Sequence, residues 1–294
     1  MASARRDEAI FATASHVRAW LLVEVHGSWG RDAVADSQLG PHAPRVWRTA
    51  MKARGIRVIA IRRDLEHHAH PSPGRRLVHV DAGRPGRPSV ASRRMIDDLH
   101  HVVAATESLA ATGVPGDGWE QGTDRYVLVC TNGRHDACCA THGRPLVRHL
   151  RTTRWGDSVW ECSHIGGDRF AGNVVMLPDS LYFGRCAPAD AERILAAHDE
   201  GRLELSRLRG RSTLTLVEQA AEHFVRSELG LDALDAIAVM RTSGPGRVHV
   251  DLTDGRAVDV AVGHSVVPSP TPLTCKGADG LGYPVFHLAE LNVT

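Results

Sequence analysis

Two short segments rich in cysteine and histidine constrain this chain more than any other feature of its sequence. The first runs from Cys130 to Cys139 and reads CTNGRHDACC, and the second, WECSHIGGDRFAG, begins at Trp160. Together they hold four of the six cysteines and lie roughly thirty residues apart. Thiolates and imidazole within reach of one another suit zinc, iron or an iron–sulfur cluster. The fold must therefore bring two separate loops together.

Composition narrows the setting of this chemistry. A chain of 294 residues is long enough for two compact domains, or for one large domain with an appendage. The formal charge of +1 gives no reason to expect a nucleic-acid partner, and no apolar run approaches a membrane span. The N-terminal segment lacks the apolar stretch of a secretory signal, so we expect a cytoplasmic protein. In a reducing cytosol, six cysteines favour metal or redox chemistry over disulfides.

The N-terminal part has the pattern of a small α/β sheet. Short apolar runs predict strands, and a stretch between a proline and a glycine predicts a helix. The strands are expected at 20–25, 56–61 and 76–81, and the helix at 41–54. The first dozen residues have the composition of a frayed end. A glycine-rich stretch at 113–118 then predicts a linker.

The middle of the chain predicts the order strand, helix, strand, hairpin, helix. The expected elements are strands at 126–129 and 159–163, a hairpin at 173–183, and helices at 139–152 and 188–197. This order corresponds to half of a thioredoxin fold or to nearly all of one. A helical apolar stripe that starts at Leu214 and two strands joined by a turn at Asp254-Gly255 end the ordered part.

These patterns predict an α/β fold in three parts. Residues 1–118 form an N-terminal α/β part, which is expected to be thioredoxin-like or of another α/β type. Residues 119–206 form a thioredoxin-like domain that carries both cysteine–histidine segments. Residues 207–294 add a smaller α+β extension of a helix and a β-hairpin.

Each segment follows the end of a predicted strand, where loops of an α/β sheet gather and form ligand sites. Cys138 and Cys139 open the following helix, whose unpaired N–H groups stabilise a thiolate. Cys162 and His164 are two residues apart, which places them on one face of an extended chain. Asp168 follows four residues after His164, across two glycines that let the backbone approach a bulky centre.

With these motifs the chain resembles the sucrase/ferredoxin-like family, which includes thioredoxin-like ferredoxins. CTNGRHDACCATHGRP and WECSHIGGDRFAGNVVMLPDSLYFGRC are similar to the family's two signatures, and WLLVEVHGSWGRD, PTPLTC and YPVFHL extend the likeness over nearly the whole chain. The resemblance implies a thioredoxin-like domain with a 2Fe–2S cluster held by two cysteines and by two histidines of an HxGGH motif. It places the cysteine ligands at Cys130 and Cys139 and the first histidine at His164.

The second histidine position of that motif is Asp168 here, so the fourth ligand departs from the family pattern. A carboxylate is a harder ligand than imidazole and is uncommon on such a cluster. Cys138 and Cys162 are near enough in sequence to take its place. We rank the candidates for the fourth ligand as Asp168, then Cys138, then Cys162.

The expected function is electron transfer by a Cys/His-ligated 2Fe–2S cluster, with an unidentified protein as redox partner. One alternative is a structural zinc module with Cys130, Cys139, Cys162 and His164 as ligands. Another is a thiol enzyme of thioredoxin type that uses Cys138 or Cys139, although the chain lacks a C-x-x-C pair. Sucrose hydrolysis is disfavoured because no spacing singles out a carboxylate pair.

The remaining cysteines and histidines have simpler interpretations. Cys186 and Cys275 are expected to be small buried core residues. His67, His68 and His70 lie in a Pro/Gly/Arg-rich stretch and are expected on a solvated loop. His135 and His142 flank the first segment and are expected either on the surface or beside the ligands.

Overall fold

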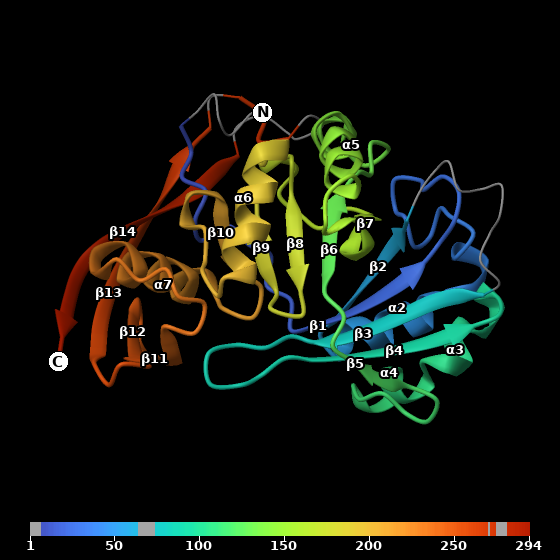
Figure 1. Ribbon diagram of the computed structural model, residues 1–294, viewed down its shortest axis with the longest axis horizontal. Helices are drawn as coiled ribbons and strands as arrows, with labels where there is room; N and C mark the ends of the chain where they lie inside the picture. Colours follow the sequence, from blue (N-terminus) through green and yellow to red (C-terminus); the bar gives the residue numbers. More distant parts are fainter. Residues whose placement is uncertain (1–6, 64–73, 270, 275–280) are drawn as a thin grey trace.

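The strands of the described residues form two sheets, one of ten strands and one of four. A computed structural model describes residues 7–63, 74–269, 271–274 and 281–294. The large sheet has the order β10-β9-β8-β6-β7-β2-β1-β3-β4-β5, and the small sheet has the order β11-β12-β13-β14 (Figure 1). The large sheet therefore contains strands from the N-terminal part and from the middle of the chain.

The first half of the large sheet comprises β1 to β5. Its strands are β1 (Ala19–Glu24), β2 (Ile56–Arg62), β3 (Arg75–Asp81), β4 (Val90–Ile96) and β5 (Glu120–Gly122). Its helices are η1 (Gly40–His42), α2 (Arg45–Ala53), η3 (Leu99–His101), α3 (Val102–Ala105) and α4 (Glu107–Thr112). β1 pairs in parallel with β2 across the α2 connection, and it pairs antiparallel with β3.

The second half repeats this arrangement. Its strands are β6 (Tyr126–Cys130), β7 (Val159–Cys162), β8 (Val174–Leu177), β9 (Leu181–Phe183) and β10 (Leu208–Arg211). Its helices are α5 (Ala137–Arg151), η4 (Gly156–Ser158), η5 (Asp168–Phe170), α6 (Pro188–Asp199) and η6 (Leu205–Arg207). β6 pairs in parallel with β7 across α5 and antiparallel with β8. The order 7-6-8-9-10 therefore matches the order 2-1-3-4-5 of the first half.

The two halves join where β2 pairs antiparallel with β7. The register places Ile61 opposite Cys162 and Arg62 opposite Glu161. Because the paired residues are the last of each strand, the loops that follow β2 and β7 leave the sheet at this junction.

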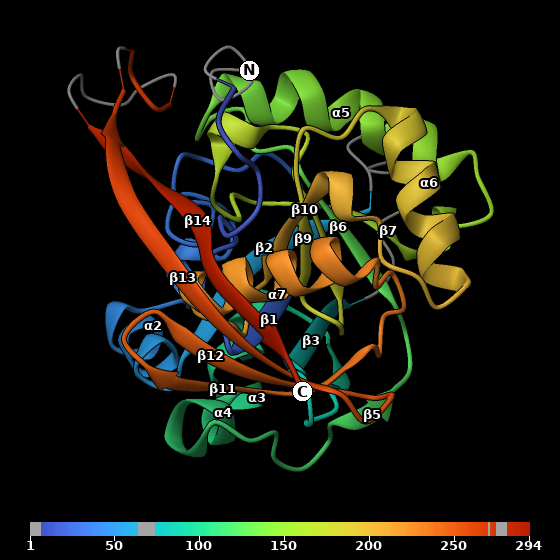
Figure 2. The same ribbon diagram turned by 90° about the vertical axis from the view of Figure 1, so that its left-hand side faces the viewer.

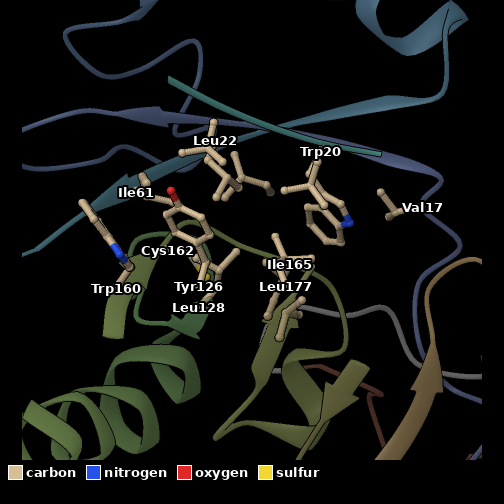
Figure 3. Close-up of a cluster of buried hydrophobic side chains, with 14 of the residues drawn as sticks. Val17, Trp20, Leu22, Ile61, Tyr126, Leu128, Trp160, Cys162, Ile165 and Leu177 are labelled. Atoms are coloured by element: carbon tan, nitrogen blue, oxygen red, sulfur yellow. The ribbon is translucent and has the colours of Figure 1, made fainter. Parts of the chain in front are cut away.

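Alternating side chains of the large sheet enter different cores. Trp20 and Leu22 of β1 share one buried cluster with Tyr126 and Leu128 of β6. Figure 3 shows the side chains of the two halves pointing toward one another across this cluster. Leu21 instead joins a second cluster on the opposite face of the first half. The sheet is therefore curled, and its inner face forms the central core.

Helices cover the outer faces of both halves. α2 contributes Trp47 and Met51 to the outer core of the first half. α5 and α6 contribute Leu146 and Ile194 to the outer core of the second half. In the second half, helix α5 lies directly against β6. The two elements are so close that a Cβ atom at Gly143 would lie 2.1 Å from the Cys130 carbonyl oxygen.

The C-terminal part packs a helix on the small sheet. The elements are α7 (Leu216–Leu229), β11 (Ile237–Gly244), β12 (Arg247–Leu252), β13 (Ala257–Pro268) and β14 (Gly282–Val293). Thr215 and Glu218 form a reciprocal capping box that starts α7. Figure 2 shows α7 lying across the sheet, with β13 and β14 extending beyond the other two strands.

The mixed α/β class is confirmed, with a large sheet and several helices. The division at residues 118 and 206 stays a prediction. The expectation of a frayed start is wrong for residues 7–12, because Glu8 and Ala12 are buried and the Arg169 guanidinium donates to the Glu8 carboxylate at 2.7 Å. None of the helices in the described residues is long and apolar enough to cross a membrane.

We predict that His79 makes folding stability depend on pH. The residue is 3% exposed, and burial lowers the pKa of its ring from 6.5 to about 4. The unfolded chain therefore takes up a proton below pH 6.5 that the folded protein takes up only near pH 4, so stability falls as the pH falls through this window. Between pH 7 and pH 5 the wild type should lose about 2 kcal/mol more than His79→Leu, measured by urea unfolding. Equal losses in the two proteins would contradict this assignment.

A second prediction tests how closely α5 packs on β6. Alanine at position 143 would clash with the Cys130 carbonyl, whereas a side chain at Gly244 meets nothing within 4 Å. Gly143→Ala should destabilise the protein by about 1–3 kcal/mol despite the higher helix propensity of alanine. Gly244→Ala is the matched control and should change the free energy of unfolding by less than about 0.5 kcal/mol. A neutral or stabilising Gly143→Ala would show that α5 is free to move away from the strand.

Candidate metal centre

Cys130, Cys139 and His164 come together in the structure. Their ligand atoms all lie within 4.8 Å of one another. Cys130 is the last residue of β6, Cys139 lies in the first turn of α5, and His164 lies two residues beyond the end of β7. The parallel pairing of β6 and β7 places Cys130 opposite Cys162, so the two strand ends bring the two motifs to one edge of the sheet.

Asp136 sets the start of α5 and with it the position of Cys139. The Asp136 carboxylate accepts a hydrogen bond from the Cys138 amide at 2.8 Å, as an N-cap residue does. The Cys139 amide donates to the Asp136 carbonyl at 3.1 Å. The helix was expected from the sequence but the role of Asp136 was not, although aspartate immediately before a helix is an N-cap signal.

The two thiols share a buried environment that favours one proton between them. The Cys139 thiol donates to the Cys130 sulfur and holds the pKa of Cys130 well below its ordinary value, with the His164 ring acting in the same direction. The same interaction, together with burial and the negative charges of Asp168 and Asp136, raises the pKa of Cys139. A cation that replaces the shared proton would relieve this accumulation of negative charge.

The ring of His164 is held from one side by a second imidazole. His135 stacks on it with ring centroids 3.7 Å apart, and the Nδ1 atom of His135 lies 3.2 Å from the Arg31 carbonyl. The Arg57 guanidinium donates to the His164 carbonyl at 3.0 Å. The Nδ1 atom of His164 is buried and makes no hydrogen bond within the described part of the chain. His135 therefore lies beside the ligands, which was one of its two expected places.

The glycines after His164 have a specific backbone role. Gly166 and Gly167 adopt φ of +95° and +76°, a region that side-chain-bearing residues rarely occupy. A side chain at Gly167 would also meet the Arg209 guanidinium at 2.3 Å. Arg209 is buried and donates to the Gly166 carbonyl at 3.0 Å. The turn that leads from His164 to Asp168 therefore favours glycine at both positions.

The three candidates for the fourth ligand lie in different surroundings, and none is in the group of three. Asp168 begins η5 and is half-buried; burial raises the pKa of its carboxyl, the His164 ring opposes the rise and Asp136 adds to it. Cys162 is fully buried in the central core, and burial together with the charge of Cys130 raises the pKa of its thiol. Cys138 is half-buried on the first turn of α5.

An open cavity of about 420 Å³ adjoins the histidine pair. His135 and His164 line it together with Arg57 of β2 and with Arg31, Asp32 and Asp36 of the loop that follows β1. The two arginines and two aspartates balance in formal charge, so the cavity selects no sign of ligand charge.

The remaining cysteines and the histidine cluster singled out in the sequence lie either away from the metal centre or outside the described residues. Cys186 is 5% exposed within the core of the second half, and its thiol donates to the Gly184 carbonyl at 3.6 Å. Its predicted core role is confirmed. Cys275 and the cluster of His67, His68 and His70 lie outside the described residues.

Two curated yeast proteins are similar to parts of this chain, and both are named Altered inheritance of mitochondria protein 32. The protein from Meyerozyma guilliermondii is 32% identical over 82 residues, which cover 25% of this chain and 29% of the relative. The protein from Candida glabrata is 28% identical over 105 residues, which cover 31% of this chain and 34% of the relative. The match thus spans about a third of each relative or less. No solved structure matches the chain significantly.

These relatives correct the functional expectation. From the sequence we expected an electron carrier with a 2Fe–2S cluster, or else a structural zinc protein or a thioredoxin-type thiol enzyme. The relatives bear a name that concerns the inheritance of mitochondria and describes no iron–sulfur electron carrier. The expectation is therefore contradicted, because it carried an activity over from ferredoxin-like members on the strength of shared ligand motifs alone.

The family itself is established by a longer match. The sequence profile described as Sucrase/ferredoxin-like matches residues 10–210, well over half of the chain. The matched region includes every strand of the first half of the large sheet, both cysteine–histidine motifs, and most of β10. This chain therefore belongs to the sucrase/ferredoxin-like family.

Proposed function

We propose that Cys130, Cys139 and His164 bind a metal centre and that holding this centre is the task of the protein. The observation that carries the proposal is the gathering of the three ligand atoms within 4.8 Å of one another. Ligand atoms of a tetrahedral zinc ion lie roughly 3.3–3.8 Å apart, so small side-chain movements would complete the geometry. The Nδ1 atom of His164 is buried and has no hydrogen-bond partner among the described residues, which also supports a bound group at this position.

The donor set fits soft metals. Two thiolates and an imidazole suit zinc or an iron–sulfur cluster better than they suit magnesium or calcium. Either a 2Fe–2S cluster or zinc is compatible with this donor set, and the metal analysis below distinguishes them. When bound, either group supplies a cationic centre that keeps both thiols deprotonated. The protein's own part is to orient His164 through His135 and Arg57 and to bury both sulfurs.

Asp168 is the fourth ligand in this proposal. Its carboxylate is near enough to act electrostatically on both Cys139 and His164, although it lies outside the group of three. Cys162 lies in the same buried cluster as Cys130 and Cys139, so burial does not exclude it, and the family motif is what ranks it behind Asp168. Asp168 thus occupies the place of the second histidine in the family motif.

We also propose that the second half of the sheet is a thioredoxin-like unit. The strand order 7-6-8-9, with α5 between β6 and β7 and α6 after β9, supports this assignment. The first half has the same order without the ligand residues. Cytoplasmic location stays a prediction, and the relatives' name makes the mitochondrion the compartment to compare with it.

The central prediction concerns metal content. Protein purified without oxygen should contain either iron with acid-labile sulfide or zinc, measured by elemental analysis and sulfide assay. Cys130→Ser, Cys139→Ser and His164→Ala should each lower that content at least about tenfold, because each removes a ligand of a buried site. Cys186→Ser is the matched control, since Cys186 is buried elsewhere, and it should keep the wild-type content. A wild-type protein without a stoichiometric transition metal would refute the proposal.

A separate prediction concerns the fourth ligand. Asp168→Ala should increase the rate of metal loss to a chelator at least about tenfold, because it removes the carboxylate beside Cys139 and His164. Cys138→Ser and Cys162→Ser should release the metal at close to the wild-type rate. A faster release from either cysteine variant than from Asp168→Ala would assign the fourth position to that thiolate.

A further inference from the structure

We propose that a second site, a cavity lined by three arginines, binds a small molecule with two or more anionic groups. The cavity has a volume of about 480 Å³ and lies between the loop after β1 and the start of α5. Its charged and polar lining includes Ser28, Arg62, Asn132, Arg134 and Arg144. The site is distinct from the metal ligands, none of which lines it.

Hydrogen bonds fix the walls of this cavity. The Asn132 side chain donates to the Gly30 carbonyl at 3.2 Å, which ties the loop of the first motif to the loop after β1. On the floor, Arg62 is 4% exposed, and its guanidinium lies 4.0 Å from the ring centroid of Trp29. The Trp29 indole donates to the Val25 carbonyl at 3.2 Å. A cavity with walls held in this way is formed before any ligand arrives.

The charge of the cavity selects an anion. All of its charged lining side chains are arginines, and no acidic residue lines it within the described part of the chain. Arg62 is neutralised by Glu161, whose carboxylate accepts from it at 2.9 Å. Arg134 and Arg144 are exposed and form no ion pair with any described residue. Two uncompensated guanidinium groups in one cavity match a ligand with at least two negative charges.

Guanidinium groups bind phosphate and carboxylate oxygens in the same bidentate manner. The shared ligand chemistry is therefore a small polyanion, either a phosphate compound or a polycarboxylate. Thr131 to Arg134 form one wall and belong to the loop between Cys130 and α5. A bound anion would thus contact the segment that positions two metal ligands, although the inference does not rest on the metal.

The test is isothermal titration calorimetry, in which the full chain is titrated with inorganic pyrophosphate and, separately, with citrate at constant ionic strength. Saturable binding of one molecule per chain is expected for at least one probe. Pyrophosphate alone would identify a phosphate ligand, and citrate alone a carboxylate ligand. Both probes also bind metal ions, so the titration is repeated with Cys130→Ser, which lacks a metal ligand but keeps the cavity. Binding that persists in this variant belongs to the cavity, and the inference is thus tested independently of the metal centre.

Charge-neutralising variants locate the binding. Arg134→Gln and Arg144→Gln should each raise the Kd at least about tenfold, because each removes a charge-assisted hydrogen bond to the ligand. Arg148→Gln is the matched control, since Arg148 is an exposed arginine of α5 that does not line the cavity, and it should keep the wild-type Kd. The inference is overturned if neither probe binds, if both cavity variants bind as tightly as the wild type, or if Arg148→Gln loses as much affinity as they do.

Discussion

The buried ion pair between Arg62 and Glu161 connects the parts of the molecule on which the site depends. It joins the last residue of β2 to the next-to-last residue of β7, where the two halves of the large sheet meet. The same Glu161 oxygen accepts from Thr131 at 2.7 Å, directly after Cys130. One carboxylate therefore fixes both the junction and the first ligand loop. Removal of one partner would leave a charge uncompensated in a buried setting, which commonly costs about 3–5 kcal/mol.

Much of the secondary structure could be predicted from sequence, whereas the way the halves combine could not. The apolar run at 56–61 predicted a strand close to the observed β2, and the proline at the start of 188–197 predicted a helix close to the observed α6. The order 2-1-3-4-5 recurs as 7-6-8-9-10, although the sequences of the two halves carry no repeat clear enough to predict it. The junction depends on two residue pairs at strand ends, and such long-range pairing leaves no periodic signal.

The candidate site was predictable because its residues follow strand ends that the hydrophobic pattern reveals. Cys130 ends one buried strand, and His164 follows the next strand in the sheet. The roles of Asp136 and Arg209 were not predicted. An N-cap aspartate is visible in sequence once the helix start is known, but a buried arginine that supports the Gly166-Gly167 turn from β10 is determined by tertiary packing. The identity of the fourth ligand also depends on tertiary packing, and it stays a prediction.

The contacts between the two halves also bear on how the centre exchanges with its surroundings. The loop after β1, which carries no ligand, contacts the first ligand loop through Gly30 and Arg31. The first half of the sheet thus covers part of the ligand loop of the second half. Release of a bound metal would then require the two loops to separate, and its rate would reflect this opening as well as the strength of the ligand bonds. A metal held there would then be retained partly by this contact between the loops, in addition to its thermodynamic affinity.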